Sequence, residues 1–179
     1  MPKITLKNSL GRLTKMDSSN SKELSLETVM PLIEERLSSG QSVKFSPKGV
    51  SMMPMLRQGV DSVLVSPVKG VLKKYDIALY RRDDGKYILH RIVKVEKNYI
   101  CIGDNQYFPK ETVKFEQVIA VVTLFFRKNK QHSVDEFSYK LYCRLWNISR
   151  FPRWILKRIN NRLKRMILRK SEGRAKWKR

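Results

Sequence analysis

Three side chains in the sequence have the types and the chain order of a hydrolytic site: a serine, a histidine and a carboxylate. Ser51 lies in the window 49–54, GVSMMP, where Pro54 favours the first position of a short helix. Ser51 would then lie just ahead of unpaired backbone N–H groups, which stabilise an oxyanion. Serine is also a common helix cap, so this window alone leaves a purely structural role open.

A nucleophilic serine needs a base, and the sequence contains two histidines. His90 shares one face of an alternating run with Ile88 and Ile92, whereas His132 lies in a polar junction typical of a solvated linker. A histidine on an apolar face is also commonly a core residue with satisfied hydrogen bonds. As a base, His90 would suit chemistry near neutral pH, because the ordinary pKa of imidazole is about 6.5.

Asp104 is the carboxylate predicted to orient the imidazole. It lies in Gly103-Asp104-Asn105, directly after a strand that is expected to end at Ile102. The same tripeptide is an ordinary turn sequence, so the position taken singly decides nothing.

Cysteine usage indicates free thiols rather than a metal site. Cys101 and Cys143 lack the spacing of metal ligands, and two cysteines do not make a disulfide framework. Free thiols are the rule in a reducing compartment. We therefore expect no metal and no cofactor.

The elements that must position these side chains are mostly strands. Short alternating or apolar runs begin at residue 43 and recur at 60–65, 77–80, 87–95, 99–102 and 118–126. Asp83-Asp84-Gly85 is a hairpin signal between two of them. Ahead of the first strand, apolar residues recur at helical spacing up to Leu37, and Gly40 provides a stop. This order predicts a mostly-β domain, a small antiparallel barrel, preceded by one helix.

The motifs together resemble the serine peptidases of the signal peptidase I and SOS-repressor type. Gly-x-Ser-Met-x-Pro, a hairpin, His-Arg-Ile-Val and Gly-Asp-Asn follow in that order within residues 43–123. By this resemblance Ser51 is the nucleophile, His90 is the base and Asp104 is the third residue. The base is Lys in most bacterial members and His in the endoplasmic-reticulum and archaeal type.

The resemblance also implies a substrate and shows departures. The substrate would be an extended peptide with small side chains before the cleaved bond, placed against a strand edge and contacting Met52, Met53 and Pro54. Gly49 stands, as a glycine does in the repressor type, where membrane-embedded members commonly have a hydroxyl that helps to bind the oxyanion. The resemblance therefore implies that backbone N–H groups, chiefly that of Ser51, are the oxyanion donors. Members with a His base usually have a further Asp soon after Gly-Asp-Asn, whereas the next acid here is Glu111.

Charge divides the chain into three parts. The formal net charge is +22, which implies an anionic partner. Residues 1–22 are basic and rich in Ser, Asn and Lys, and we expect them to be disordered. Residues 23–127 have an ordinary globular composition and, by the resemblance, are the peptidase domain, whereas residues 128–179 form a tail with 17 Lys and Arg against three acids.

The tail is predicted to be helical, with a break at Pro152. Its second half has apolar residues on one face and basic residues on the other, a pattern typical of helices that lie in a membrane interface. The residues expected to bind anions or membrane are Trp154, Lys157, Arg158, Arg162, Lys164, Arg165 and Arg169. Docking of this helix on the protein's own core, and nucleic-acid binding without a recognisable reader motif, are the alternatives.

These observations favour a serine endopeptidase that cleaves a leader- or signal-like peptide. The longest nearly apolar run, nine residues, is well below the ~20 needed to cross a bilayer, and no export signal is seen. We therefore expect a cytoplasmic enzyme, peripheral on the inner membrane face. An autoproteolytic repressor-type regulator is one alternative, although the chain has no Ala-Gly or Cys-Gly dipeptide to cleave. A non-catalytic binding module on a peptidase-like scaffold is the other.

Overall fold

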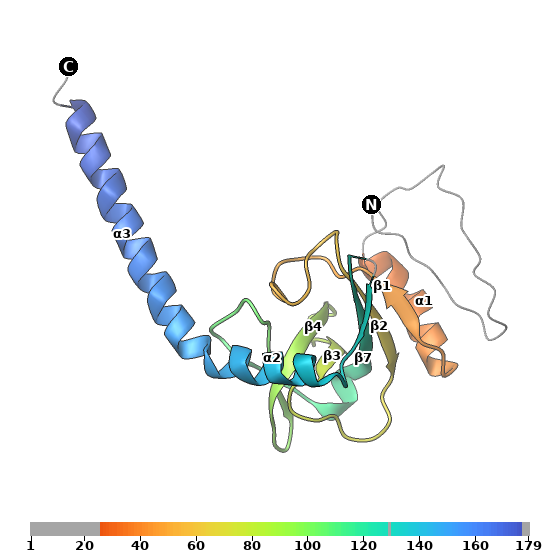
Figure 1. Ribbon diagram of the computed structural model, residues 1–179. Coiled ribbons are helices and arrows are strands. Elements are labelled where there is room, and N and C mark those ends of the chain that lie inside the picture. The colour runs from red at the N-terminus through yellow and green to blue at the C-terminus, as the bar shows by residue number, and fades with distance from the viewer. Residues whose placement is uncertain (1–25, 129, 177–179) are drawn as a thin grey trace.

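The structure is a computed structural model that describes residues 26–128 and 130–176 (Figure 1). Its first element is helix α1, Leu26–Ser38. The strands are β1 Val43–Phe45, β2 Ser62–Pro67, β3 Ile77–Arg81, β4 Tyr87–Val95, β5 Tyr99–Ile102, β6 Glu111–Val113, β7 Val118–Arg127 and β8 Lys130–Ser133. A short 3-10 turn at Phe115–Gln117 precedes β7, and the chain continues with helices α2, Phe137–Ile148, and α3, Arg150–Lys176.

All strands join one antiparallel sheet in the order β1-β2-β7-β3-β4-β5-β6, and β8 pairs with β7. The sheet is not closed on itself. The mostly-β prediction is thus confirmed, together with the helix before the sheet and the helices after it. The hairpin predicted at Asp83-Asp84-Gly85 joins β3 to β4, with Arg81 opposite Tyr87.

Two strands escaped the sequence analysis because they are short and polar. Strand β6 has three residues, and β8 consists of Lys-Gln-His-Ser. The expectation that His132 is a solvated linker residue is wrong: it lies on β8, and its ring stacks on Phe125 at 5.1 Å. Pairing with β7 provides the order that the polar sequence does not signal.

Apolar side chains cover both faces of the sheet. One face packs against α1, which contributes Met30, Ile33 and Leu37 to the larger core. The other face has a smaller core around Tyr80, Ile92 and further residues of β3 to β6. His90 and Ile92 alternate with Arg91 along β4, so His90 belongs to the smaller core's face and Arg91 to the opposite one.

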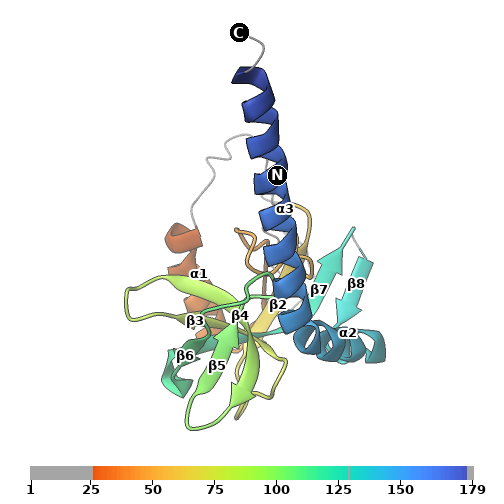
Figure 2. The same cartoon turned by 90° about the vertical axis from the view of Figure 1, so that its left-hand side faces the viewer.

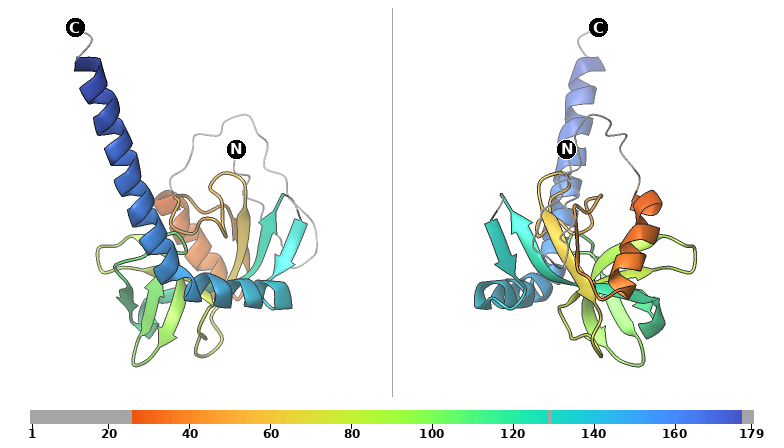
Figure 3. Two further views of the ribbon diagram at one scale, coloured as in Figure 1. Left: turned by 60° about the vertical axis from the view of Figure 1, so that its left-hand side comes forward. Right: turned by 90° about the vertical axis from the view of Figure 1, so that its right-hand side faces the viewer.

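The tail begins as part of the domain and ends away from it. Tyr139 and Cys143 on α2 are buried in the larger core. Figures 1, 2 and 3 show α2 against the sheet and α3 extending from the domain as a single long helix. The helix break falls at Ser149 rather than at the predicted Pro152, because Pro152 lies in the first turn of α3, where its missing N–H has no helical partner to lose.

Parts of the sequence-based predictions fall outside this description. The predicted disorder of residues 1–22 concerns residues that the structure does not describe. Arg169 lies on α3, but its side chain is likewise outside the description. Among the described residues, none of the helices combines the length and apolar character needed to cross a membrane.

Candidate active site

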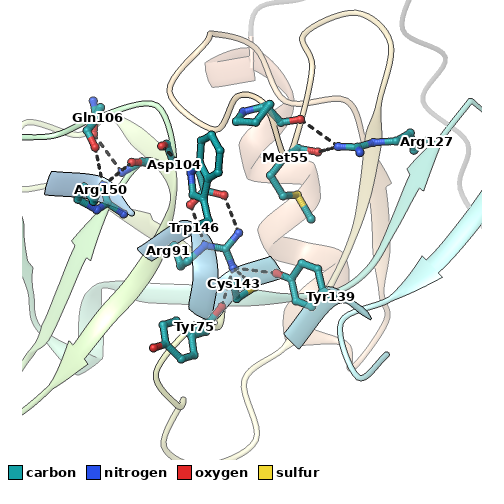
Figure 4. A network of polar contacts seen from close by, with 12 residues as sticks. Met55, Tyr75, Arg91, Asp104, Gln106, Arg127, Tyr139, Cys143, Trp146 and Arg150 are labelled. Carbon is teal, nitrogen blue, oxygen red and sulfur yellow. Dashed lines mark hydrogen bonds and ion pairs between the residues drawn. The ribbon is translucent and has the colours of Figure 1, made fainter. Parts of the chain in front are cut away.

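Ser51 lies half-buried in the serine loop, which we define as residues 49–56. The expected one-turn helix is absent. Separate hydrogen bonds from Met53 N to Val50 O and from Leu56 N to Met52 O close successive turns instead of a helical ladder. A helix N-terminus therefore does not contribute to an oxyanion site here. Arg127 of β7 fixes the far end of the loop through bonds to the carbonyls of Pro54 and Met55 (Figure 4).

The serine loop packs directly on the Asp104 loop, residues 103–107. Asn105 makes two bonds across the contact: its N–H donates to Ser51 O at 2.8 Å and its amide group to Val50 O at 3.1 Å. Gly103 has to be glycine, since an added Cβ would stand 2.6 Å from Ser51 O and 3.0 Å from Ser51 Cβ. The close approach of these two loops sets the position of the serine.

The strand register brings His90 to the same place. Arg91 of β4 is opposite Ile102, the last residue of β5, so the same register continued by one residue in each chain would set His90 opposite Gly103. Side chains at opposed positions share a face, with Cβ atoms about 5 Å apart. A Cβ built on Gly103 would lie 3.0 Å from Ser51 Cβ. Together with the spacing of about 5 Å between opposed Cβ atoms, this puts Ser51 Cβ within about 8 Å of His90 Cβ. Serine and histidine side chains can meet across such a span.

His90 is buried, with a definite set of polar partners. Its Nδ1 lies 3.2 Å from the hydroxyl of Tyr80 and 3.8 Å from Oε2 of Glu111. The Tyr80 hydroxyl donates its single proton to Glu111 Oε2 at 2.7 Å. Toward His90 the hydroxyl can therefore act only as an acceptor, which requires that Nδ1 carries a proton. This arrangement favours the tautomer that carries its proton on Nδ1 and leaves Nε2 free to act as a base.

Burial controls the protonation of this cluster. It lowers the pKa of His90 to about 4, although the nearby charge of Glu111 acts in the opposite direction. For Glu111, burial alone would raise the pKa, but hydrogen bonds from Arg82 and Tyr80 outweigh it and the pKa is lowered. Near neutral pH the site therefore holds a neutral imidazole beside an ionised carboxylate.

Asp104, which the sequence assigns to orient His90, makes its described side-chain hydrogen bonds to Arg91 and none to the imidazole. Both of its carboxylate oxygens accept hydrogen bonds from Arg91, at 2.7 Å each, in a fully buried ion pair (Figure 4). Arg91 also donates to Tyr75 O, and its guanidinium lies 2.9 Å from the Tyr139 hydroxyl and 3.0 Å from Cys143 Sγ. Asp104 and Arg91 thus tie β4 and the Asp104 loop to α2.

The tail helices hold the Asp104 loop from the other side. Trp146 of α2 donates its indole N–H to Asp104 O at 2.9 Å. Arg150, at the start of α3, donates to the carbonyls of Gly103 and Gln106 (Figure 4). The loop against which Ser51 packs is therefore shaped in part by residues beyond 136.

Backbone donors suited to an oxyanion remain in the serine loop. Among the described residues, no hydrogen bond involves the N–H of Ser51 or that of Met52. The Ser51 hydroxyl and His90 Nε2 likewise have no partner in the described structure, so the serine–histidine bond is not formed here. Catalytic hydrogen bonds often tighten only when substrate is bound.

The three residues expected to contact substrate divide into two groups. Met52 is buried in the larger core, where its side chain anchors the serine loop, so only the backbone of this residue is placed to contact a substrate. Met53 and Pro54 are exposed and line an open cavity of about 370 Å³ together with Asn105, Tyr107, Trp146, Arg153 and Leu156. This cavity lies between the serine loop, the Asp104 loop and the tail helices.

The predicted anion-binding residues also divide. Trp154 is half-buried and meets the ring of Phe108 edge-on, Lys157 lies 5.2 Å from the ring centre of Tyr107, and Arg158 lies over Trp154. These three are at the end of α3 that contacts the domain. Arg162, Lys164 and Arg165 are exposed on the part that extends from it.

Sequence reasoning missed Tyr80 and left Glu111 without a role. Glu111 had one signal, as the first acid after Gly-Asp-Asn. Tyr80 had none, because a tyrosine near the end of an apolar strand is ordinary. Comparison with known proteins adds no assignment: neither a scan of protein-family models nor a search of curated proteins found a match.

Proposed function

We propose that the protein is a serine endopeptidase with Ser51 as nucleophile and His90 as general base. The observation that carries this proposal is the close approach of Ser51 Cβ to Gly103, where only a glycine leaves room for it. Continued by one residue, the β4–β5 register would set Gly103 opposite His90. The order of the motifs supports a peptidase core of the signal peptidase type, for which the open β-sheet is the frame.

In the proposed mechanism, Ser51 Oγ attacks the carbonyl carbon of the peptide while His90 Nε2 accepts the hydroxyl proton. The backbone N–H groups of Ser51 and Met52 donate to the oxyanion. His90 then gives the proton to the leaving amine, and water releases the acyl group by the reverse sequence. Glu111 and Tyr80 are positioning residues, since they act on the reaction only through the imidazole.

The charge of the tail supports a location at an anionic membrane surface. Between residues 137 and 171 the sequence has no acidic residue. On α3, Ile159 and Leu163 are about half exposed and belong to an apolar face that no described element covers. Such a helix suits a bilayer interface, with its basic residues near lipid phosphates. The substrate would be a leader- or signal-like peptide that reaches this surface.

A fluorophosphonate probe, which reacts with activated serines, tests the assignment. We expect saturable labelling of the wild-type protein and none of Ser51→Ala, whereas the nearby control Ser46→Ala should label normally. Peptide hydrolysis should fall at least about 10³-fold in Ser51→Ala. The loss of one hydroxyl should change stability by about 1 kcal/mol or less. Equal labelling of wild type and Ser51→Ala would refute the proposal.

A further inference from the structure

The cavity beside the serine loop is lined by an arginine, and none of its described lining residues is acidic. Arg153 lines it, and its guanidinium lies 3.4 Å from the ring centre of Trp146. Its described hydrogen bonds go to Trp146 O at 2.7 Å and to Ser149 Oγ at 3.2 Å, and no described carboxylate lies within 4 Å of it. A stacked and partly desolvated cation of this kind would be stabilised by an anion from outside the chain.

Nearby cations add to the positive charge at this cavity. Arg150 uses Nη1 for the Asp104 loop, but its buried Nε and Nη2 have no hydrogen-bond partner. Lys157 lies over the Tyr107 ring, which lines the same cavity. The carboxylate of Asp104 also acts on these arginines, but both of its oxygens are bonded to Arg91. Burial lowers the pKa of both Arg150 and Arg153, and the charge of Asp104 opposes this shift without cancelling it.

We propose that this cavity binds an acidic side chain of the peptide substrate, near the cleaved bond. Its volume of about 370 Å³ is within the range of ligand pockets. Trp146, Met53 and Leu156 give apolar walls for the methylene groups of a glutamate, and Arg153 faces the carboxylate. A peptide is the favoured occupant because Met53, Pro54 and Asn105 belong to the two loops that position Ser51. The inference rests on the proposed function and adds a specificity to it.

Quenched fluorescent peptides that carry Glu, Gln or Lys at successive positions test the proposal. Glu should exceed Gln by about tenfold in kcat/KM at one position near the cleaved bond, and Lys should be poorest. Arg153→Met should lower kcat/KM for the Glu peptide about tenfold more than for its Gln partner. The control Arg144→Met, which removes an exposed arginine from α2, should leave the Glu-to-Gln ratio unchanged.

A second variant avoids the packing of Arg153. Leu156 is 65% exposed at the rim of the cavity, so Leu156→Glu should fold normally and reverse the preference for acidic peptides. Equal cleavage of Glu and Gln peptides by the wild type would overturn the proposal. An equal effect of Arg153→Met on both peptides would overturn it as well.

A binding measurement tests this inference independently of the proposed catalytic activity. Fluorescence anisotropy of the labelled peptides on Ser51→Ala protein needs no catalysis, so the Glu preference should appear there even if fluorophosphonate labelling fails. Vesicles of phosphatidylglycerol form the other arm. Loss of vesicle retention in Arg153→Met but not in Arg144→Met, without a Glu preference among peptides, would assign the cavity to a lipid phosphate and overturn the peptide proposal.

Discussion

The basic tail contains two segments of similar composition that behave differently. The docked segment, residues 137–158, has six Lys and Arg, and the projecting segment, residues 159–176, has seven. Tyr139, Cys143 and Trp146 of the docked segment contact the core or the Asp104 loop. Every described side chain from residue 159 to residue 166 is exposed. Charge therefore does not distinguish the two; the difference lies in the aromatic and small side chains on the packed face of α2.

The largest effect should come from truncating the chain ahead of the docked segment, in contrast to a truncation that removes only the projecting part of α3. Removal of residues 137–179 takes Tyr139 and Cys143 out of the core and leaves Arg91 short of two contacts. We expect aggregation, because apolar surface is then exposed. Removal of residues 160–179 should leave a soluble protein that cleaves short peptides normally. Solubility, thermal unfolding and peptide hydrolysis compare the two proteins. A soluble, active protein lacking residues 137–179 would contradict the division of the tail.

The next largest effect is a contrast between the two carboxylates near His90, Asp104 and Glu111, when each is replaced by its amide. Asp104→Asn leaves the buried Arg91 without its ion pair, and we expect a loss of about 3–5 kcal/mol in the free energy of unfolding. Glu111→Gln removes the charge behind Tyr80 at a half-buried site, so the main loss should be in turnover. Denaturant unfolding beside peptide kinetics tests this contrast. A stable Asp104→Asn protein with low turnover would return Asp104 to the role predicted from the sequence.

The places of these two carboxylates show what the sequence could and could not supply. Ser51 and His90 were singled out because a serine and a histidine of suitable type lie in ordered motifs. The partner of His90 depends on which face of the strand each side chain occupies. Ile102 shares a face with Arg91, and Asp104, two residues later, falls beside Arg91 as well. The face on which Asp104 lies follows from the register of β4 against β5, which the sequence does not specify.

The fold follows the same pattern. The long strands β4 and β7 were predicted nearly to the residue, because β4 alternates throughout and β7 is a nearly continuous apolar run. Strands β6 and β8 are ordered by the neighbours with which they pair, and their polar residues give no local signal. Glu111, at the start of β6, reaches His90 through that pairing. The division of the tail at residue 158 was hidden for a similar reason, since packing partners distant in sequence decide it.

A smaller effect should appear in the pH dependence of stability, which depends on the sheet and not on the tail. Burial lowers the pKa of His90 to about 4, so below about pH 6.5 the unfolded chain takes up a proton that the folded protein does not. Stability should therefore decline as pH falls from about 6.5 to about 4. The contribution of His90 should be about 2.5 kcal/mol at pH 4.5. Denaturant unfolding at pH 7 and pH 4.5 measures this decline.

His90→Gln is the matched variant for the pH measurement. Its free energy of unfolding should not show the decline between about pH 6.5 and pH 4 that is due to His90. The lowered pKa of Glu111 acts at lower pH, below the ordinary carboxyl value of about 4.3. The same pKa predicts that kcat/KM of the wild type stays level from pH 7 to about pH 5. An acidic limb in kcat/KM at about pH 6.5 would show that the imidazole is not desolvated in the working enzyme.

The smallest effect concerns single charges of the projecting segment. Each Lys or Arg near an anionic bilayer contributes about 1 kcal/mol, so Arg162→Gln should weaken binding to phosphatidylglycerol vesicles about fivefold. Arg165→Gln should add a similar loss. The control Lys97→Gln removes an equal charge from an exposed turn of the sheet and should change vesicle binding little. Co-sedimentation at two or more salt concentrations provides the measurement.

The apolar and basic faces of the projecting segment can be separated by salt. Screening acts over about 8 Å at physiological ionic strength, so high salt should weaken wild-type vesicle binding without abolishing it, because Ile159 and Leu163 still insert. Leu163→Ser should lose this salt-resistant part and keep the salt-sensitive part. A nucleic-acid tail would show the reverse, with tight DNA or RNA binding, a steep dependence of log affinity on log salt and no vesicle retention at high salt. Equal losses for Arg162→Gln and Lys97→Gln would mean that the whole positive field of the protein, rather than α3, attracts the membrane.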